Sequence, residues 1–585
     1  NGTPIVDAVI CISPFSLLVS AGESLRDEDN FLRSLTGVPV FQTMLAQGDF
    51  LNFADMRAGA DRRTISSFTA WAELDGQIDC VPIGCMTRDA GGNALTIPLP
   101  ERIDHLSRLV RNWSDLRRKE NKDKRIAVVL YQKLADCGRI GSAAGLDCAG
   151  SVIGMLKRLE SEGYTVGDIP ENGRALLDIL ISRVSNCLDS FSEPQIRETS
   201  ADIMDGEIYK ERFGKLPEFN RGDMAGRWGE PPGNQFVLGD GLIIPGTAFG
   251  NVLVTVQPLR SWDDPDRMYH DPVLPPHHQY LAFYQWLRDV FRADAVIHLG
   301  THGSLEWLPG KNTGLSCSCY PDIALDCLPD IYPYIIDNPG EGVQAKRRSE
   351  AVLDGYGAPA MTRSELGGAM NDLDDLVREY LEQASQNRGR DDLLEKIRDK
   401  LREESIAESL KIDPDDPDLA GKTGTIADRL EEIRDTLIPY GLHIMGKPPE
   451  GQDLIDTIVS SLRVRGDCGD SLRDAVSSDF CLDRERDIEK IESLCGEIVS
   501  RLYESGFDEN AIPDICDPDS RTGDICRFVC DTLVPSLLRT DMELETITGS
   551  LGGKYIVPGP PGALSRGQTN ALPTGRNTYG LDPDA

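Results

Sequence analysis

Short, almost wholly apolar runs alternate with amphipathic stretches along the first 365 residues. A run that is apolar on both faces is typical of a parallel strand, because helices cover both sides of a parallel sheet. The runs are IVDAVICISPF (5–15), GVPVF (37–41), RIAVVLY (125–131), NVLVTVQP (251–258), DAVIHLG (294–300) and IYPYIID (331–337). The pattern predicts an α/β fold of several domains, with parallel or mixed sheets flanked by helices.

Changes in composition predict five regions. Beyond residue 365 the sequence becomes charged and helical, and DPDDPD (413–418) must interrupt any helix there. In order, we expect a flavodoxin-like α/β unit (1–100), a second α/β unit (101–225), an α/β core (226–365), a large helical lobe toward the C-terminus (366–545) and a Gly/Pro-rich extended segment (546–585). The chain starts at Asn1 without a signal-peptide core, and we expect a fragment of a longer subunit.

The overall charge excludes one class of partner. Lys and Arg number 61 against 96 Asp and Glu, which gives a net charge of -35. Binding a nucleic acid needs clustered basic residues, so we expect no nucleic-acid partner. No apolar run is long enough to span a bilayer, and the 15 cysteines form no CxxC pair. We expect no membrane span, no disulfide framework, and a reducing, cytoplasmic location.

Histidines concentrate in one part of the chain. Five of the seven lie between His270 and His302, and DAVIHLGTHGSLEW predicts a strand, a glycine-containing turn and a helix start. His302 and Glu306 would share the first helical turn, with His298 at the strand end. Two imidazoles and a carboxylate can bind a transition metal or accept protons, and the spacing leaves both roles open. The alternative is a core histidine beside a tight turn.

Two further groups of residues border this region. His277 and His278 begin a striped helix that contains Tyr280, where they either face the same cleft or act as solvent-exposed caps. A turn and a basic helix follow the strand IYPYIID, and this combination favours carboxylate or phosphate groups unless the helix only presents a solvated basic face. The candidate residues of this anion side are Asn338, Glu341, Lys346, Arg347 and Arg348, with Arg576 in the tail.

Two segments of the chain resemble a phosphate-binding loop, but neither has the complete motif. GLHIMGKP (441–448) has the Gly-x4-Gly-Lys spacing but ends in Pro448, and AGKT (420–423) has Asp416 where the first glycine belongs. If the reaction needs ATP, we expect another subunit to bind it.

Several long motifs resemble one family. They are NVLVTVQP, YHDPVLPPHHQYLAFYQWLR, AVIHLGTHGSLEWLPGK, YPYIIDNPGEGVQAKRRSEAVL, GLHIMG and LPTGRNTYGLDP. With them the chain resembles the large subunit of cobaltochelatase (CobN) and the related porphyrin-binding H subunit of magnesium chelatase. The motifs EWLPGK and NPGEG are more similar to those of the cobalt branch, whereas THGSLE also resembles the motif of the magnesium branch.

The resemblance implies an ATP-dependent ligase that forms nitrogen–metal bonds. The divalent ion is a substrate, Co²⁺ in first place and Mg²⁺ as the alternative, and it enters a corrin precursor or a porphyrin. ATP-Mg is hydrolysed on AAA+ partner subunits, in agreement with the missing phosphate loop.

The resemblance also implies roles for the candidate residues. Glu306 would accept a proton or bind the metal transiently, while His298 and His302 present the ion. The basic triplet would pair with peripheral carboxylates of the ring, and Trp307 and Tyr280 would pack on its plane.

Two other functions stay open. One is a non-catalytic tetrapyrrole-binding or sensing protein of the same family. The other is a metal-dependent hydrolase built on HxxxHxxxE, and the absence of an HExxH helix weighs against it.

Overall fold

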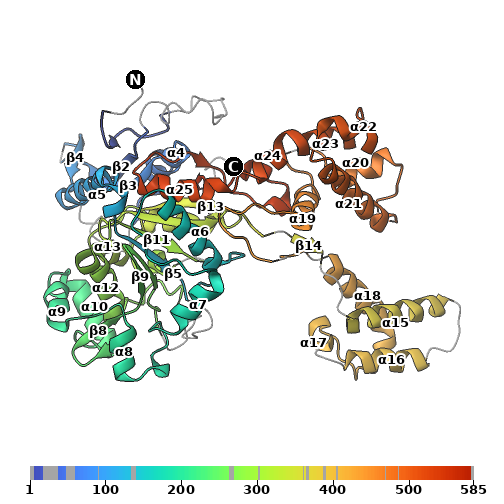
Figure 1. The fold of residues 1–585 in the computed structure, drawn as a ribbon, viewed down its shortest axis with the longest axis horizontal. Coiled ribbons are helices and arrows are strands. Elements are labelled where there is room, and N and C mark those ends of the chain that lie inside the picture. The colour runs from blue at the N-terminus through green and yellow to red at the C-terminus, as the bar shows by residue number, and fades with distance from the viewer. Residues whose placement is uncertain are drawn as a thin grey trace.

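A computed structural model describes most of the chain (Figure 1). It describes residues 5–17, 37–47, 59–89, 91–132, 140–261, 269–300, 303–359, 361–363, 368–385, 391–402, 406–435, 437–439, 441–467, 469–484 and 486–580. Across these ranges, no helix combines the length and the apolarity needed to cross a membrane. The cysteines in the same ranges are all free thiols.

A six-stranded sheet forms the centre of the molecule. Its order is β13-β12-β11-β5-β10-β9, and only β9 runs antiparallel to its neighbour. The strands are β5 (Ile126–Leu130), β9 (Thr247–Phe249), β10 (Val252–Val256), β11 (Ala295–Leu299), β12 (Asp330–Ile335) and β13 (Ala351–Tyr356). Every residue of β5 is buried, and its side chains alternate between the cores on the two faces of the sheet. The predicted parallel sheet is confirmed.

Helices cover both faces of this sheet. One face carries α5 (Pro100–Arg118), α6 (Cys148–Ser161), α7 (Gly173–Ile181), α14 (Pro339–Arg348) and α25 (Asp541–Leu551). The other carries α9 (Gly206–Phe213), α10 (Glu218–Trp228), α12 (His278–Trp286) and α13 (Tyr320–Leu325). The apolar stripe of α5 includes Leu109, Trp113 and Leu116, all about 1% exposed, so the predicted amphipathic helix is present.

Smaller sheets complete the α/β part. The N-terminal sheet contains β1 (Val9–Cys11), β2 (Val40–Gln47), β3 (Ile78–Arg88) and β4 (Ala94–Pro98), with β1 to β3 parallel. A three-stranded sheet contains β6 (Asp202–Met204), β7 (Val237–Leu238) and β8 (Gly241–Ile244). The first predicted strand is much shorter than IVDAVICISPF.

The structure corrects the predicted boundary at residue 225. β5 belongs to the predicted second unit, yet it pairs with β10 and β11 of the predicted core. The two regions therefore build one sheet. β5 pairs with strands more than a hundred positions away in the sequence. Local composition does not predict pairing over such a distance.

The predicted helical lobe consists of two groups of helices with separate cores, which Figure 1 shows at the right. The first contains α15 (Gly368–Ser385), α16 (Asp391–Leu401), α17 (Ile406–Leu410) and α18 (Leu419–Asp435). The second contains α19 (Gln452–Ser461), α20 (Leu472–Asp479), α21 (Ile488–Glu504), α22 (Ile512–Ile515), α23 (Arg521–Phe528) and α24 (Val534–Leu537). The antiparallel pair β14 (Met361–Arg363) and β15 (Leu437–Pro439) brackets the first group. The break at DPDDPD lies between α17 and α18, as predicted.

Residues 546–551 of the predicted extended segment form the end of helix α25, whereas the rest of the segment is largely extended, as its glycines and prolines predict, and lies along the edge of the central sheet. The amide of Gly355 in β13 donates to the carbonyl of Arg576 at 3.1 Å, and the Gly575 amide donates back to the Gly355 carbonyl at 2.7 Å. The short strands β16 (Pro558–Gly559) and β17 (Asn577–Thr578) pair within the segment. Gly575 has φ +79°, and a Cβ there would lie 2.3 Å from the backbone carbon of Met542.

We expect Gly575→Ala to destabilise the protein by about 2 kcal/mol, because alanine disfavours positive φ and its Cβ would displace the start of α25. The thermal unfolding midpoint should fall. Gly222→Ala, in the middle of α10 with open space around it, is the matched control and should leave the midpoint unchanged or raise it. Equal midpoints for the two variants would show that the tail is not docked in this way.

Candidate functional site

His298, on β11, lies in a buried chain of hydrogen bonds. Its Nδ1 lies 2.7 Å from Oδ1 of Asp330, the first residue of β12, and its Nε2 lies 2.9 Å from the Tyr284 hydroxyl. His298 is 2% exposed. A carboxylate on one imidazole nitrogen fixes the orientation of the ring. Both nitrogens are engaged, so His298 in this arrangement has none open for the metal ion predicted there.

Glu306 is the most unusual group of the site. It lies in a 3₁₀ turn, Leu305–Trp307, where the sequence predicted the start of a longer helix. Its side chain is 0% exposed. Oε1 accepts a hydrogen bond from the Tyr332 hydroxyl at 3.1 Å, and Oε2 has no hydrogen-bond partner among the described residues. Burial raises the pKa of Glu306 to about 8. A carboxyl group with such a pKa can take up and release protons near neutral pH.

Polar side chains from three elements hold the loop between His298 and Glu306. Oε1 of Gln257 accepts from the Ser304 amide at 2.7 Å, and the Tyr280 hydroxyl lies 2.9 Å from Oγ of Ser304. The Tyr269 hydroxyl donates to the Gly303 carbonyl at 2.8 Å. A small gap of about 140 Å³ lies against His298, Gln257, Gly303 and Tyr332. His302, the third predicted member, lies outside the described residues.

The histidines at the start of α12 serve the fold. Nδ1 of His277 accepts from the Tyr280 amide at 3.2 Å, which caps the helix, and Nε2 donates to the Leu259 carbonyl at 2.6 Å. Burial lowers the pKa of His277 to about 3, so this imidazole is neutral. His278 donates to the Gly229 carbonyl at 2.9 Å. The capping role is present, but both rings are buried, which corrects the predicted exposure to solvent or cleft.

The predicted ring-packing aromatics have partners inside the chain. Tyr280 is 0% exposed and belongs to the hydrogen-bond network that holds the loop. Trp307 is half-buried and packs edge-on against His270, with 4.5 Å between ring centroids. Of the two, only Trp307 has part of its surface open to a ligand.

The basic triplet at the end of α14 also has partners inside the chain. Lys346 donates to Asn577, and Nε of Arg347 lies 2.8 Å from Oε1 of Glu73. Arg348 donates to the backbone carbonyls of Glu306, Leu308 and Lys311 at 2.7, 2.6 and 2.9 Å. These bonds replace the predicted contacts with substrate carboxylates, and Arg348 instead holds the Glu306 loop in place.

The remaining anion-side candidates are also engaged. Nδ2 of Asn338 donates to Oε2 of Glu341 at 2.8 Å, at the start of α14. Arg576 donates to the carbonyls of Asn570 and Leu572 at 2.6 and 3.1 Å. These contacts stabilise the helix start and the C-terminal segment.

A cleft with a cavity volume of about 290 Å³ opens beyond the end of β13. Residues 357–359, segment 441–450, the second helical group and the C-terminal segment line it. β13 and β11 are parallel members of one sheet, so the cleft beyond Gly357 and the loop beyond Leu299 lie at the same edge. Ligand sites of α/β sheets lie at this carboxyl edge.

His443 marks the floor of the cleft, and the sequence reasoning did not select it. Its Nε2 lies 2.8 Å from Oε2 of Glu543, which also accepts from the Gly446 amide at 3.0 Å. Oε1 of the same carboxylate accepts from the Gly357 amide at 3.1 Å. The sequence feature that could have indicated His443 as a site residue is its place inside the motif GLHIMG, far from the main group of histidines. Only the folded chain brings Glu543 to it.

Comparison with known proteins assigns the chain to a family. The family model described as CobN/Magnesium Chelatase matches residues 1–585, and the chain belongs to this family. It is 34% identical to the aerobic cobaltochelatase subunit CobN of Pseudomonas aeruginosa over 93% of its length and 46% of that protein. It is 30% identical to the H subunit of magnesium chelatase from Chlorobaculum parvum over 94% of its length and 44% of that protein.

A solved structure agrees. The catalytic subunit of cobaltochelatase from Mycobacterium tuberculosis matches with a TM-score of 0.83 and 32% sequence identity, over 99% of this chain and 50% of that one. The chain thus spans about half the length of the relatives it matches.

We expect Tyr332→Phe to raise the pKa of Glu306 above about 8, because the tyrosine hydroxyl stabilises the charged carboxylate. The protonated carboxyl band in the infrared spectrum, measured as a difference against Glu306→Gln, should persist to higher pH in the variant. An unchanged or lower titration midpoint would contradict a stabilising hydrogen bond from Tyr332.

Proposed function

We propose that this chain forms the metal-insertion site of a chelatase catalytic subunit, which places a divalent ion in a tetrapyrrole. One observation carries the proposal. Glu306 is a fully buried carboxyl group at the carboxyl edge of the sheet, its pKa is near neutrality, and its Oε2 has no hydrogen-bond partner among the described residues. Family membership supports it. The motifs EWLPGK and NPGEG resemble the cobalt branch of the family, and this similarity favours Co²⁺ over Mg²⁺ as the inserted ion.

The chemistry of insertion requires a base. A macrocycle carries two pyrrolic N–H protons, and both must leave as the divalent ion takes the four nitrogens. In the proposal, Oε2 of Glu306 accepts one of these protons while the Tyr332 hydroxyl holds Oε1, and the second proton passes to solvent. His298 acts as a positioning residue, because its bonds to Asp330 and Tyr284 fix the wall beside Glu306. His302 keeps its predicted role of presenting the ion.

The ring itself needs more room than the gap at His298. The cleft lined by His443 lies at the same edge of the sheet as Glu306 and has a cavity volume of about 290 Å³, and we assign the periphery of the macrocycle to it, with the pyrrole nitrogens toward Glu306. Lys447 lines the same cleft and would pair with a peripheral carboxylate of the ring, in place of the internally bonded basic triplet. ATP hydrolysis would come from AAA+ partner subunits, since neither Gly-Lys motif here completes a phosphate loop.

We expect Glu306→Gln to lower the rate of insertion by about 10²-fold or more while the ring still binds. The assay combines the full-length subunit, its ATPase partners, ATP, and either Co²⁺ or Mg²⁺. Only the ionised carboxylate accepts a proton, so the wild-type rate should rise with pH until it levels off above about pH 8, and this rise should vanish in the variant.

The control is Glu207→Gln, which changes a glutamate that is 79% exposed on α9 and should leave the rate and its pH profile unchanged. A wild-type rate in Glu306→Gln would remove Glu306 as the base. Ring binding by the wild-type protein without insertion of either ion would favour the alternative of a non-catalytic tetrapyrrole-binding protein.

A further inference from the structure

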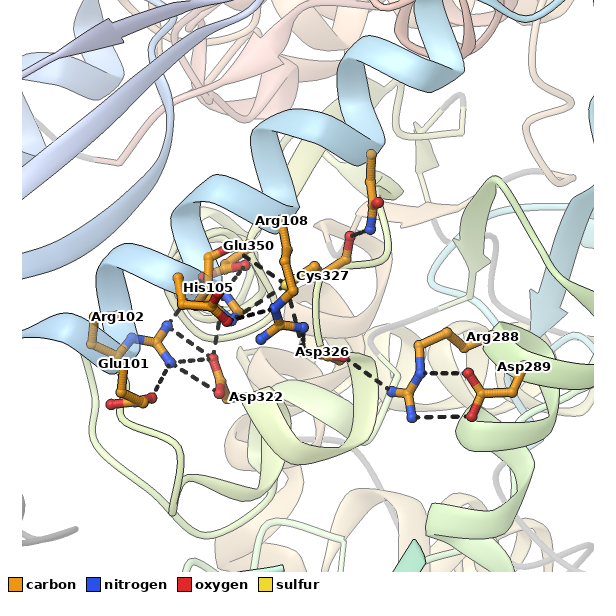
Figure 2. A network of polar contacts seen from close by, with 12 residues as sticks. Glu101, Arg102, His105, Arg108, Arg288, Asp289, Asp322, Asp326, Cys327 and Glu350 are labelled. Atoms are coloured by element: carbon orange, nitrogen blue, oxygen red, sulfur yellow. Dashed lines mark hydrogen bonds and ion pairs between the residues drawn. The ribbon is translucent and has the colours of Figure 1, made fainter. Parts of the chain in front are cut away.

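We propose that His105, Asp326 and Cys327 form a second metal site, which binds a divalent d-block ion such as Zn²⁺ or Co²⁺ and is separate from Glu306. His105 lies on α5, and the other two residues form the turn between α13 and β12. Figure 2 shows the three side chains converging from these two elements. Each offers one ligand atom, and the three atoms lie within 4.8 Å of one another.

The spacing of the donor atoms fits a tetrahedral ion. Sγ of Cys327 lies 3.5 Å from Nδ1 of His105 and 3.5 Å from Oδ1 of Asp326. With metal–sulfur and metal–nitrogen bonds of about 2.3 and 2.0 Å, tetrahedral angles place neighbouring ligand atoms about 3.5 Å apart. The carbonyl of His105 lies at the same 3.5 Å from the sulfur.

The surroundings of His105 match those of a metal ligand. Its Nε2 lies 3.1 Å from both carboxylate oxygens of Glu350 and 3.6 Å from Oδ1 of Asp322. Metal-binding histidines donate their second ring N–H to such a carboxylate, which leaves the other nitrogen facing the ion. Arg102 donates a hydrogen bond to Asp322 at 3.0 Å, and this bond holds the Asp322 carboxylate beside His105.

The turn presents its ligands from a fixed backbone. Asp326 has a left-handed φ of +56°, and the Cys327 carbonyl accepts from Nδ2 of Asn112 on α5 at 2.7 Å. Cys327 is 2% exposed, whereas the Asp326 side chain is 30% exposed. An ion can therefore reach the buried Cys327 sulfur from the Asp326 side, where solvent would supply the fourth ligand.

Two arginines approach Asp326 and limit how it can bind. The guanidinium of Arg108 lies 2.8 Å from Oδ1, and that of Arg288 lies 3.6 Å from Oδ2. Asp289 holds Arg288 at 3.1 Å, and Figure 2 shows the Arg288 guanidinium between Asp289 and Asp326. A carboxylate oxygen has two acceptor positions, so Oδ1 can accept from Arg108 and still bind the ion.

The donor set determines which ions the site takes. A thiolate, an imidazole and a carboxylate suit Zn²⁺, Co²⁺ and related ions, and a thiolate disfavours Mg²⁺. Cys327 precedes Asp330, the partner of His298, by three residues, so the site lies at the amino end of β12, whereas Glu306 lies at the carboxyl edge of the sheet. A bound ion would join α5 to the start of β12.

The test is a titration of the full chain with Co²⁺, read by the thiolate-to-cobalt charge-transfer absorption in the near ultraviolet. We expect one equivalent of this signal in the wild-type protein, its loss in Cys327→Ser, and affinity lower by about 10-fold or more in Glu350→Gln. Mg²⁺ in excess should not displace the ion, and Zn²⁺ should.

Two controls separate this site from others. Cys516→Ser breaks up the pair of thiols formed by Cys516 and Cys526, whose sulfurs lie 3.9 Å apart, and should keep the signal. Glu306→Gln should keep it as well, because the insertion site contributes no thiolate; failure of the proposed function would thus leave this result unchanged. Circular dichroism checks that Cys327→Ser is folded. Absence of the signal in the wild type, or its survival in folded Cys327→Ser, would overturn the proposal.

Discussion

Burial of the central sheet on both faces is the constraint on which the rest of the structure depends. β5 and β11 contribute only buried residues, and the helices of two separate cores cover them. Such strands can present polar groups only where they end. The sheet is parallel across five strands, so all these ends meet at one edge, and both Glu306 and the cleft lined by His443 lie there.

The same burial explains the chemistry of the site. Glu306 is removed from water, which raises its pKa toward neutrality, and one hydrogen bond from Tyr332 offsets only part of that effect. A carboxyl group in this state is costly for stability. The hydrogen-bonded network of Tyr284, His298 and Asp330 fixes the side chains that surround Glu306. Arg348 fixes the adjoining loop, because its donors bind three backbone carbonyls there.

Charged residues inside this protein have two kinds of surroundings. Arg347 is bound to Glu73, and Lys346 to Asn577, so these cations link distant parts of the chain. At Cys327, by contrast, an imidazole nitrogen, a carboxylate oxygen and a backbone carbonyl each lie 3.5 Å from one sulfur. The first pattern is typical of structural ion pairs, and the second offers the donor types of a metal site.

The sequence by itself determined the α/β class, the central strands and the break at DPDDPD, because these follow from local periodicity and residue chemistry. It predicted the wrong surroundings for Lys346, Arg347 and Arg348, since a basic helix end looks the same whether solvent or a distant carboxylate faces it. Only the tertiary structure decided that regions 101–225 and 226–365 share one sheet, that Glu543 meets His443, and that Cys327 meets His105. Each of these contacts joins residues at least a hundred positions apart, and pairing at that distance is decided by packing of the whole chain.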